Sequence, residues 1–295
     1  MPAGMLTGAV CNGSASAPAP GSNREHFCDV GLLRANQMKI PAMVLAAGRG
    51  ERMRPLTDHH PKPLLTVQGR PLIEWVLRAL AGGACSRVVI NTAWLGDQLP
   101  GRLGQRFSPG LDGSALHTAL DLYYSNEGQD FGRALETAGG ISRALPILLP
   151  QEGDEFFWLA AGDVFAPDFA FDGADVERFV ASKVLAHLWL VPNPAHHPRG
   201  DFGISAQGLA LNVGPDDPRP SWTYSTVGLY RRALFRQPWC AVKPGNPMGE
   251  SLALAPLLRK AMDQGLVAAS VYEGLWVDVG TPERLAIVNQ ATMRR

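Results

Sequence analysis

Hydrophobic positions recur along the chain as short apolar runs that alternate with segments of helical period. The runs at residues 40–46, 88–90 and 156–161 have the length and apolar content of buried strands. Apolar residues at every third or fourth position predict one helix beginning at Pro71 and another over residues 136–145. This alternation predicts an α/β fold, with a Rossmann-like, mixed but mostly parallel central sheet and helices on both faces.

The pattern changes after Lys183. A strand over residues 184–191 is followed by short alternating segments at 202–213 and 222–230, which predict an antiparallel extension of the kind that binds a second substrate. The remaining expected elements are a strand at 120–124, a short helix and loop at 94–107, a helix at 252–264, a strand at 275–279 and a helix beginning at Pro282 after its N-cap, Thr281.

The first 37 residues differ in composition from the rest. Residues 11–23 are almost entirely Ala, Ser, Pro, Gly and Asn, which bury too little apolar surface to offset the entropy of ordering. We therefore expect a disordered extension over residues 1–37 and one α/β domain over residues 38–295. Translation starting at Met38 is an alternative explanation of the boundary.

Charge and cysteine usage exclude several classes of protein. The 27 basic and 27 acidic residues cancel, so nothing favours binding to nucleic acid or to a membrane surface. No apolar run reaches the roughly 18 residues that a membrane span needs. The four cysteines are scattered without metal-ligand spacing, which predicts reduced thiols and a cytoplasmic protein.

A glycine-rich loop follows the first expected strand. Small residues at Ala47, Gly48 and Gly50 allow the backbone to approach a ligand closely, and its N–H groups can form a nest for an anion. Arg52 and its neighbouring arginines add positive charge that suits phosphate oxygens. Met53 replaces the third glycine of a dinucleotide-binding fingerprint, and no Gly-Lys-Ser/Thr follows, so neither common phosphate-loop motif is present.

Three further charged residues complete the candidate site. Lys62 lies between two prolines that hold the chain extended, 12 residues after Gly50, so it can fold back towards the same phosphates. Asp163 and Asp278 each follow an apolar run, at the strand end where α/β proteins bind ligands. An aspartate there is often a turn former, but two of them beside a phosphate loop favour Mg²⁺ bound through oxygen.

These motifs together resemble the signature of the sugar-1-phosphate nucleotidyltransferase family, over about residues 38–292. The resemblance rests on five collinear segments: Leu-Ala-Ala-Gly-x-Gly-x-Arg at 45–52, Pro-Lys-Pro-Leu at 61–64, Glu-Thr-Ala-Gly-Gly-Ile at 136–141, Ala-Gly-Asp at 161–163 and Trp-Val-Asp-Val-Gly-Thr-Pro at 276–282. It implies Mg²⁺-dependent nucleotidyl transfer from a nucleoside triphosphate to a sugar 1-phosphate, with release of pyrophosphate.

Within this family the chain is most similar to N-acetylmuramate 1-phosphate uridylyltransferases of peptidoglycan recycling. The similarity lies in residues 48–57, 89–96, 193–202 and 254–259. It implies UTP and N-acetylmuramate 1-phosphate as substrates. Mannose-1-phosphate guanylyltransferase and glucose-1-phosphate nucleotidyltransferase activities stay open, as does a non-catalytic nucleotide-sugar-binding regulatory protein. The sequence does not fix the oligomeric state, and a monomer is compatible with it.

The resemblance also implies roles for individual residues. Arg52 and Lys62 correspond to the catalytic residues at the triphosphate, and Asp163 and Asp278 to the Mg²⁺ ligands. Asp201 could contact a sugar hydroxyl or simply hold a turn. The other expected contacts are Ala47, Gly48, Gly50, Glu127 and Thr137 with the nucleotide, and Gly139 and Asn193 with the sugar.

Overall fold

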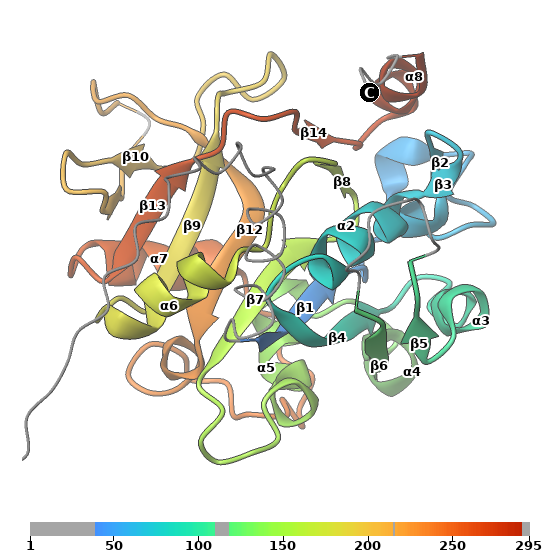
Figure 1. The fold of residues 1–295 in the computed structure, drawn as a ribbon, viewed down its shortest axis with the longest axis horizontal. Helices are drawn as coiled ribbons and strands as arrows, with labels where there is room; N and C mark the ends of the chain where they lie inside the picture. The colour runs from blue at the N-terminus through green and yellow to red at the C-terminus, as the bar shows by residue number, and fades with distance from the viewer. Residues whose placement is uncertain (1–38, 110–117, 215, 291–295) are drawn as a thin grey trace, which may run out of the picture. The chain divides into compact units, whose positions relative to one another are not determined.

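The computed structural model describes residues 39–109, 118–214 and 216–290. The extension expected over residues 1–37 lies outside this part of the chain. An eight-stranded sheet forms the centre of the described unit (Figure 1). In spatial order its strands are β13 (Val267–Val271), β9 (Ala186–Val191), β12 (Thr223–Arg231), β7 (Phe156–Ala161), β1 (Ile40–Leu45), β4 (Cys85–Thr92), β6 (Leu120–Asn126) and β5 (Arg106–Phe107).

Most neighbouring strands of the sheet run parallel. β1 pairs in parallel with β4 and β7, β4 with β6, and β13 with β9. β12 runs antiparallel to both β7 and β9, and β5 runs antiparallel to β6. The predicted fold class, a mixed and mostly parallel sheet in an α/β protein, is confirmed.

Helices cover both faces of the sheet. Successive residues of a strand point to opposite faces, so each buried strand contributes side chains to both helix layers. On β1, Met43 packs in one core cluster with α5 (Glu136–Leu148) and α7 (Leu254–Met262). The next residue, Val44, packs in a second cluster with α2 (Leu72–Ala81), α3 (Gln98–Leu103) and α6 (Gly173–Ala181). A near-continuous apolar sequence in β1 therefore fits a strand buried on both faces.

Short elements connect this framework and lie mostly at the carboxyl ends of its parallel strands. They are η1 (Glu51–Met53), η2 (Lys62–Leu64), β2 (Thr66–Val67), β3 (Arg70–Pro71), α4 (Glu127–Phe131), β8 (Val164–Phe165), β10 (Gly203–Ile204), β11 (Ala210–Leu211), η3 (Arg232–Phe235), β14 (Val277–Asp278) and α8 (Pro282–Gln290). α8 begins at Pro282 as predicted, and the backbone N–H of Arg284 donates to Thr281 Oγ1 at 3.4 Å.

The structure corrects two expectations about the second half of the chain. Residues 222–230 were expected in a separate antiparallel extension, but β12 lies inside the central sheet. Of the segments expected in that extension, the β10–β11 hairpin is the part that lies outside the central sheet. The strand expected at 275–279 is the two-residue β14, which pairs with β8 rather than with the central sheet. The edge strand β13 was not predicted, because residues 267–271 contain three small residues that weaken the apolar signal.

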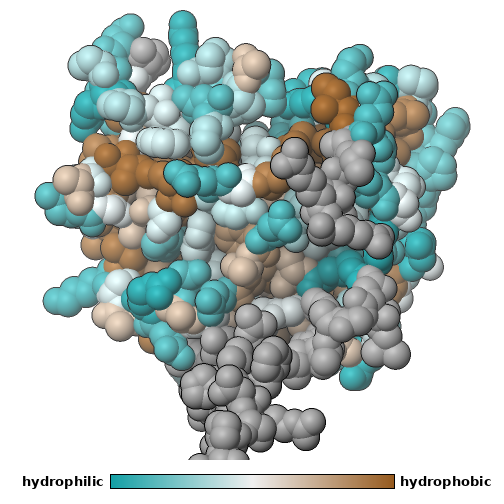
Figure 2. All heavy atoms as spheres, turned by 45° about the horizontal axis from the view of Figure 1, so that its top comes forward, coloured by the Kyte–Doolittle hydropathy of each residue, from teal (hydrophilic) through white to brown (hydrophobic). Residues whose placement is uncertain are grey.

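Polar side chains, drawn in teal in Figure 2, project around the edge of the face shown there, and apolar residues in brown lie mostly between them. Within the described residues, no helix is both long enough and apolar enough to cross a membrane.

His187 makes the stability of the fold depend on pH. Its ring lies in β9, with Nε2 2.9 Å from Ser270 Oγ of β13. Burial, assisted by the charge of Arg178, lowers the pKa of His187 from 6.5 to about 4. Between pH 6.5 and about 4, His187 is therefore protonated in the unfolded chain but mostly neutral in the folded chain.

We expect the free energy of unfolding to fall as the pH drops from about 6.5 towards 4, by on the order of 2 kcal/mol from this one group. Urea unfolding at pH 4.5 and 7.5 measures the difference. His187→Gln retains a polar group near Ser270 but cannot take up the proton, so its loss of stability on acidification should be smaller. An equal loss in both proteins would show that His187 is not responsible.

Candidate active site

The glycine-rich loop turns sharply after β1. Gly50 adopts φ +66°, in the left-handed region that glycine enters at little cost. A Cβ at this position would lie 3.0 Å from Thr57 Cγ2 and 3.2 Å from Lys62 Cβ. Thr57 Oγ1 donates a hydrogen bond to the Gly50 carbonyl at 2.8 Å. The loop is therefore folded back on itself, and Lys62 lies against it as the sequence predicts.

Lys62 brings the two candidate metal ligands together. Its Nζ lies 2.6 Å from Asp163 Oδ2 and 3.7 Å from Asp278 Oδ1, and the Lys62 side chain is only 9% exposed. The pairing of β14 with β8 places Asp278 opposite Val164, the residue after Asp163. Arg284 of α8 holds the other Asp278 oxygen, with NH1 3.0 Å from Oδ2. Two carboxylates that are distant in sequence thus share one cation.

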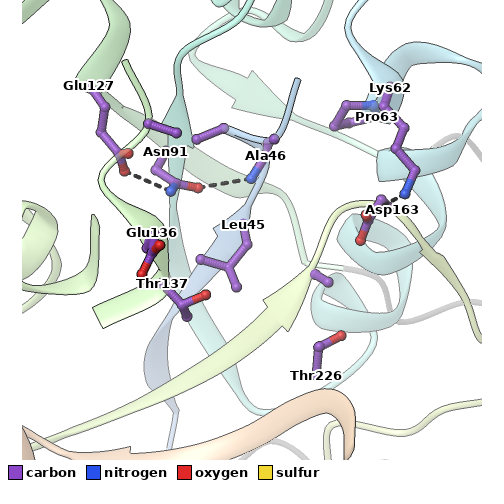
Figure 3. A pocket seen from close by; sticks show the side chains of 14 residues that line it. Leu45, Ala46, Lys62, Pro63, Asn91, Glu127, Glu136, Thr137, Asp163 and Thr226 are labelled. Carbon is purple, nitrogen blue, oxygen red and sulfur yellow. Dashed lines mark hydrogen bonds and ion pairs between the residues drawn. The ribbon is translucent and has the colours of Figure 1, made fainter. Parts of the chain in front are cut away.

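A first cavity of about 270 Å³ opens beside this cluster, at the carboxyl ends of β1, β4 and β7 (Figure 3). Figure 3 shows Lys62 and Asp163 on one side and Glu127, Glu136 and Thr137 on the other. The residues that line it are Leu45, Ala46, Ala47, Gly48, Lys62, Pro63, Asn91, Glu127, Ala134, Glu136, Thr137, Ala161, Asp163 and Thr226.

A buried polar bridge joins the walls of the first cavity. Asn91 accepts a hydrogen bond from the Ala46 N–H at 2.8 Å and donates to Glu127 Oε1 at 2.7 Å. Glu127 Oε2 accepts from the Leu135 N–H at 2.8 Å. Burial raises the pKa of Glu127, and the hydrogen bonds from Asn91 and Leu135 oppose that rise. Asn91 therefore fixes the end of β1 against the segment that precedes α5.

Replacing Asn91 with Ala should destabilise the protein and loosen the first cavity. The change leaves the Ala46 N–H and one oxygen of Glu127 without a partner in a buried site, which costs about 1–3 kcal/mol. Thermal unfolding and the KM for the triphosphate measure the two effects. Asn289→Ala is the control, because it removes an exposed amide that, like Asn91, accepts one hydrogen bond and donates another. Equal stability of the two variants would contradict the bridging role of Asn91.

A second cavity of about 400 Å³ lies on the other side of Asp163. Arg52 lines it and makes no hydrogen bond or ion pair with any other described residue, so its charge is available to a ligand. Burial, and then the charge of Arg284, lower the pKa of His196. The lining residues are Arg52, Asp163, Val164, His196, His197, Thr223, Tyr224, Thr226, Trp276 and Asp278.

The structure brings some predicted contacts together and leaves others outside both cavities. Asn193 accepts from Thr223 Oγ1 at 2.9 Å and donates to the Ser221 carbonyl at 3.0 Å. Asp201 accepts from the Tyr224 N–H at 2.8 Å and lies 3.2 Å from His197 Nε2. These two side chains thus support residues that line the second cavity.

Gly139 lines neither cavity. It is buried in α5, and a Cβ there would come within 2.5 Å of the Glu250 carbonyl oxygen. Gly50 also lies outside the cavity walls and shapes the loop behind them. The expectation that these two glycines contact a ligand therefore finds no support in the cavity geometry.

Several residues of the site carried no role in the sequence analysis, among them Asn91, Arg284 and Thr226. Asn91 lies inside the motif at 89–96, and Arg284 lies two residues after the motif at 276–282, but their partners are known only from the fold. No sequence motif indicated Thr226, because its position in the site depends on the shift in register between β12 and β9. The place of each of these three residues in the site is set by contacts between segments that are distant in the sequence.

Comparisons with known proteins show which families this chain resembles. A family model described as a MobA-like NTP transferase domain matches residues 42–123, which include the glycine-rich loop, Lys62 and Asn91. The chain is 43% identical over 250 residues to an N-acetylmuramate alpha-1-phosphate uridylyltransferase of Neisseria meningitidis, covering 83% of this chain and 95% of that protein. A protein of the same name from Caulobacter vibrioides is 32% identical, with coverage of 82% and 92%.

A solved structure shares the fold. A putative glucose-1-phosphate thymidylyltransferase from Bacillus anthracis superposes with a TM-score of 0.64 at 18% identity, over 87% of this chain and 98% of that one. The chain belongs to the sugar-1-phosphate nucleotidyltransferase family with a MobA-like NTP transferase domain. Two of its relatives, of which it covers 95% and 92%, carry the name N-acetylmuramate alpha-1-phosphate uridylyltransferase.

Proposed function

We propose that this protein transfers a uridylyl group from UTP to N-acetylmuramate 1-phosphate, giving UDP-N-acetylmuramate and pyrophosphate, in the cytoplasm and as a step of peptidoglycan recycling. The observation that carries the proposal is the convergence of Lys62, Asp163 and Asp278 beside two adjoining cavities. One cavity is bounded by the anion-binding loop and suits the nucleotide. The other, with Arg52 and two histidines, suits the sugar phosphate. Arg52 was expected at the triphosphate, but it lines this second cavity rather than the first.

The donor set at the junction fits Mg²⁺. Two aspartates are available, and Mg²⁺ commonly takes one or two protein carboxylates with the rest of its ligands from phosphates and water. Within the described residues no group of three or more His, Cys, Asp or Glu side chains could hold a metal alone. Asp163 and Asp278 would hold the ion, which when bound offsets the negative charge of the triphosphate.

The side chains of the site favour direct in-line displacement. The phosphate of the sugar is ionised at neutral pH, so its oxygen attacks the α-phosphorus without a general base, and pyrophosphate departs with the bonding electrons. Two phosphate charges about 4 Å apart repel each other by roughly 4 kcal/mol at an effective dielectric constant near 20. Arg52, Lys62 and the N–H groups of the loop reduce this repulsion and position the two substrates.

Other activities in the same family are the alternatives. The chain is 33% identical to a mannose-1-phosphate guanylyltransferase of Mycobacterium tuberculosis, of which it covers 62%. A regulatory protein without activity is disfavoured, because Arg52, Lys62, Asp163 and Asp278 are all present and face the cavities.

Pyrophosphate release in a matrix of triphosphates and sugar phosphates tests the proposal. UTP with N-acetylmuramate 1-phosphate should give the highest kcat/KM, above GTP with mannose 1-phosphate and dTTP or UTP with glucose 1-phosphate. No release from UTP and N-acetylmuramate 1-phosphate, with release from another pair, would replace the proposed substrates. Chelation of Mg²⁺ should abolish the reaction, and added Mg²⁺ should restore it.

A further inference from the structure

Thr226 has a backbone conformation that a β-branched residue rarely adopts. Its φ is +63°, and it is the one β-branched residue among the described non-glycine residues with positive φ. It lies in β12, where the register against β9 shifts between Tyr224 and Val227. Such strained positions persist only where the surrounding structure enforces them, and they cluster at functional sites.

Neighbouring residues hold this irregularity in place. Ser225 is buried, and its Oγ donates to the Trp189 carbonyl at 2.6 Å while accepting from the Val227 N–H at 3.1 Å. The Ser225 carbonyl accepts from Trp276 Nε1 at 3.1 Å. The backbone on both sides of Thr226 is therefore fixed before any ligand binds.

Thr226 lies where the reacting atoms must meet. Of the described residues, only Asp163 and Thr226 line both cavities, and Figure 3 shows Thr226 on the Asp163 side of the first cavity, away from Glu127. If the nucleotide occupies one cavity and the sugar phosphate the other, the new bond forms at their junction. Thr226 is partly exposed there.

The hydroxyl of Thr226 can turn to a ligand at little cost. It donates at 2.5 Å to the Ser225 carbonyl, the same oxygen that accepts from Trp276. When the hydroxyl rotates away, that carbonyl keeps Trp276 as a donor, so no buried acceptor is left unpaired.

We infer that Thr226 binds the sugar 1-phosphate, with Oγ1 donating a hydrogen bond to a phosphate oxygen at the junction of the two cavities. The strained backbone presents this hydroxyl beside Asp163. The inference rests on the proposed function, and it adds a residue that selects and positions the attacking substrate.

Thr226→Val, which keeps the shape and removes the hydroxyl, tests the contact. Loss of a hydrogen bond to a charged phosphate should lower kcat/KM for the sugar phosphate about 10-fold to 100-fold. The KM for UTP should stay within about twofold, because the hydroxyl is inferred to bond the sugar phosphate and not the nucleotide. Thr226→Ser retains the hydroxyl and should keep kcat/KM within a few-fold of the wild type.

Thr226→Gly tests the strain. Glycine adopts positive φ freely, so this variant should unfold at a temperature higher by about 2–4 °C while losing activity as Thr226→Val does. Gln68→Gly is the matched control, because Gln68 has φ +50° and lines neither cavity; its kinetics should equal those of the wild type.

The outcomes separate this inference from the proposed function. A wild-type protein that turns over normally, together with a Thr226→Val variant of unchanged kcat/KM, would overturn the role of Thr226 alone. A lower melting temperature for Thr226→Gly would overturn the claim of strain. A wild-type protein that releases no pyrophosphate with any sugar phosphate would overturn both proposals.

Discussion

Asp163→Asn is expected to lower kcat by at least about 10²-fold to 10³-fold while the protein stays folded. The amide removes one of the two carboxylates proposed to bind Mg²⁺ and the closest partner of Lys62. Stability should change little, because the Asp163 side chain is 38% exposed and Lys62 retains Asp278 at 3.7 Å. Pyrophosphate release and thermal unfolding measure the two effects.

Asp121→Asn is the matched control for this change. Asp121 pairs with Arg106 on the surface of β6, with its side chain 58% exposed, and lines neither cavity. Its turnover should equal that of the wild type. Near-normal turnover of Asp163→Asn would remove Asp163 from the reaction.

Arg52→Ala should reduce kcat/KM by about 10²-fold or more without a measurable loss of stability. Arg52 is exposed, has no partner among the described residues and faces the second cavity, so its charge serves a ligand rather than the fold. An exposed side chain without partners contributes within about 0.5 kcal/mol to the free energy of unfolding.

Arg54→Ala offers a control in the same loop. Arg54 lies two residues away, pairs with Asp58 at 3.2 Å and lines neither cavity. The two variants should have the same melting temperature and differ only in their steady-state kinetics. Equal activity of the two would show that Arg52 does not act on the phosphates.

The main features of the fold and site could be predicted from local sequence. Apolar runs that end in glycine or aspartate identify the buried strands and their carboxyl ends, where ligands of α/β proteins collect. Asp163 after β7 was predicted for this reason, and Lys62 was predicted from the prolines on either side of it and its spacing from Gly50. Their proximity to Asp278 is now a structural fact, while the roles assigned to them stay predictions.

The remaining features depend on long-range pairing. Nothing near residues 223–231 shows that β12 enters the sheet between β7 and β9 in the antiparallel sense. The bridge from Ala46 through Asn91 to Glu127 joins three separate segments. The left-handed backbone of Thr226 is imposed by contacts of Ser225 and Trp276, so a local propensity for threonine would predict an ordinary strand.

The most direct test is a crystal structure of the protein with Mn²⁺ and a non-hydrolysable UTP analogue, with anomalous scattering used to locate the metal. We expect a manganese peak within coordination distance of both Asp163 and Asp278, and the triphosphate between Gly48 and Lys62 in the first cavity. A metal bound away from both carboxylates, or phosphates outside the first cavity, would contradict the proposed active site.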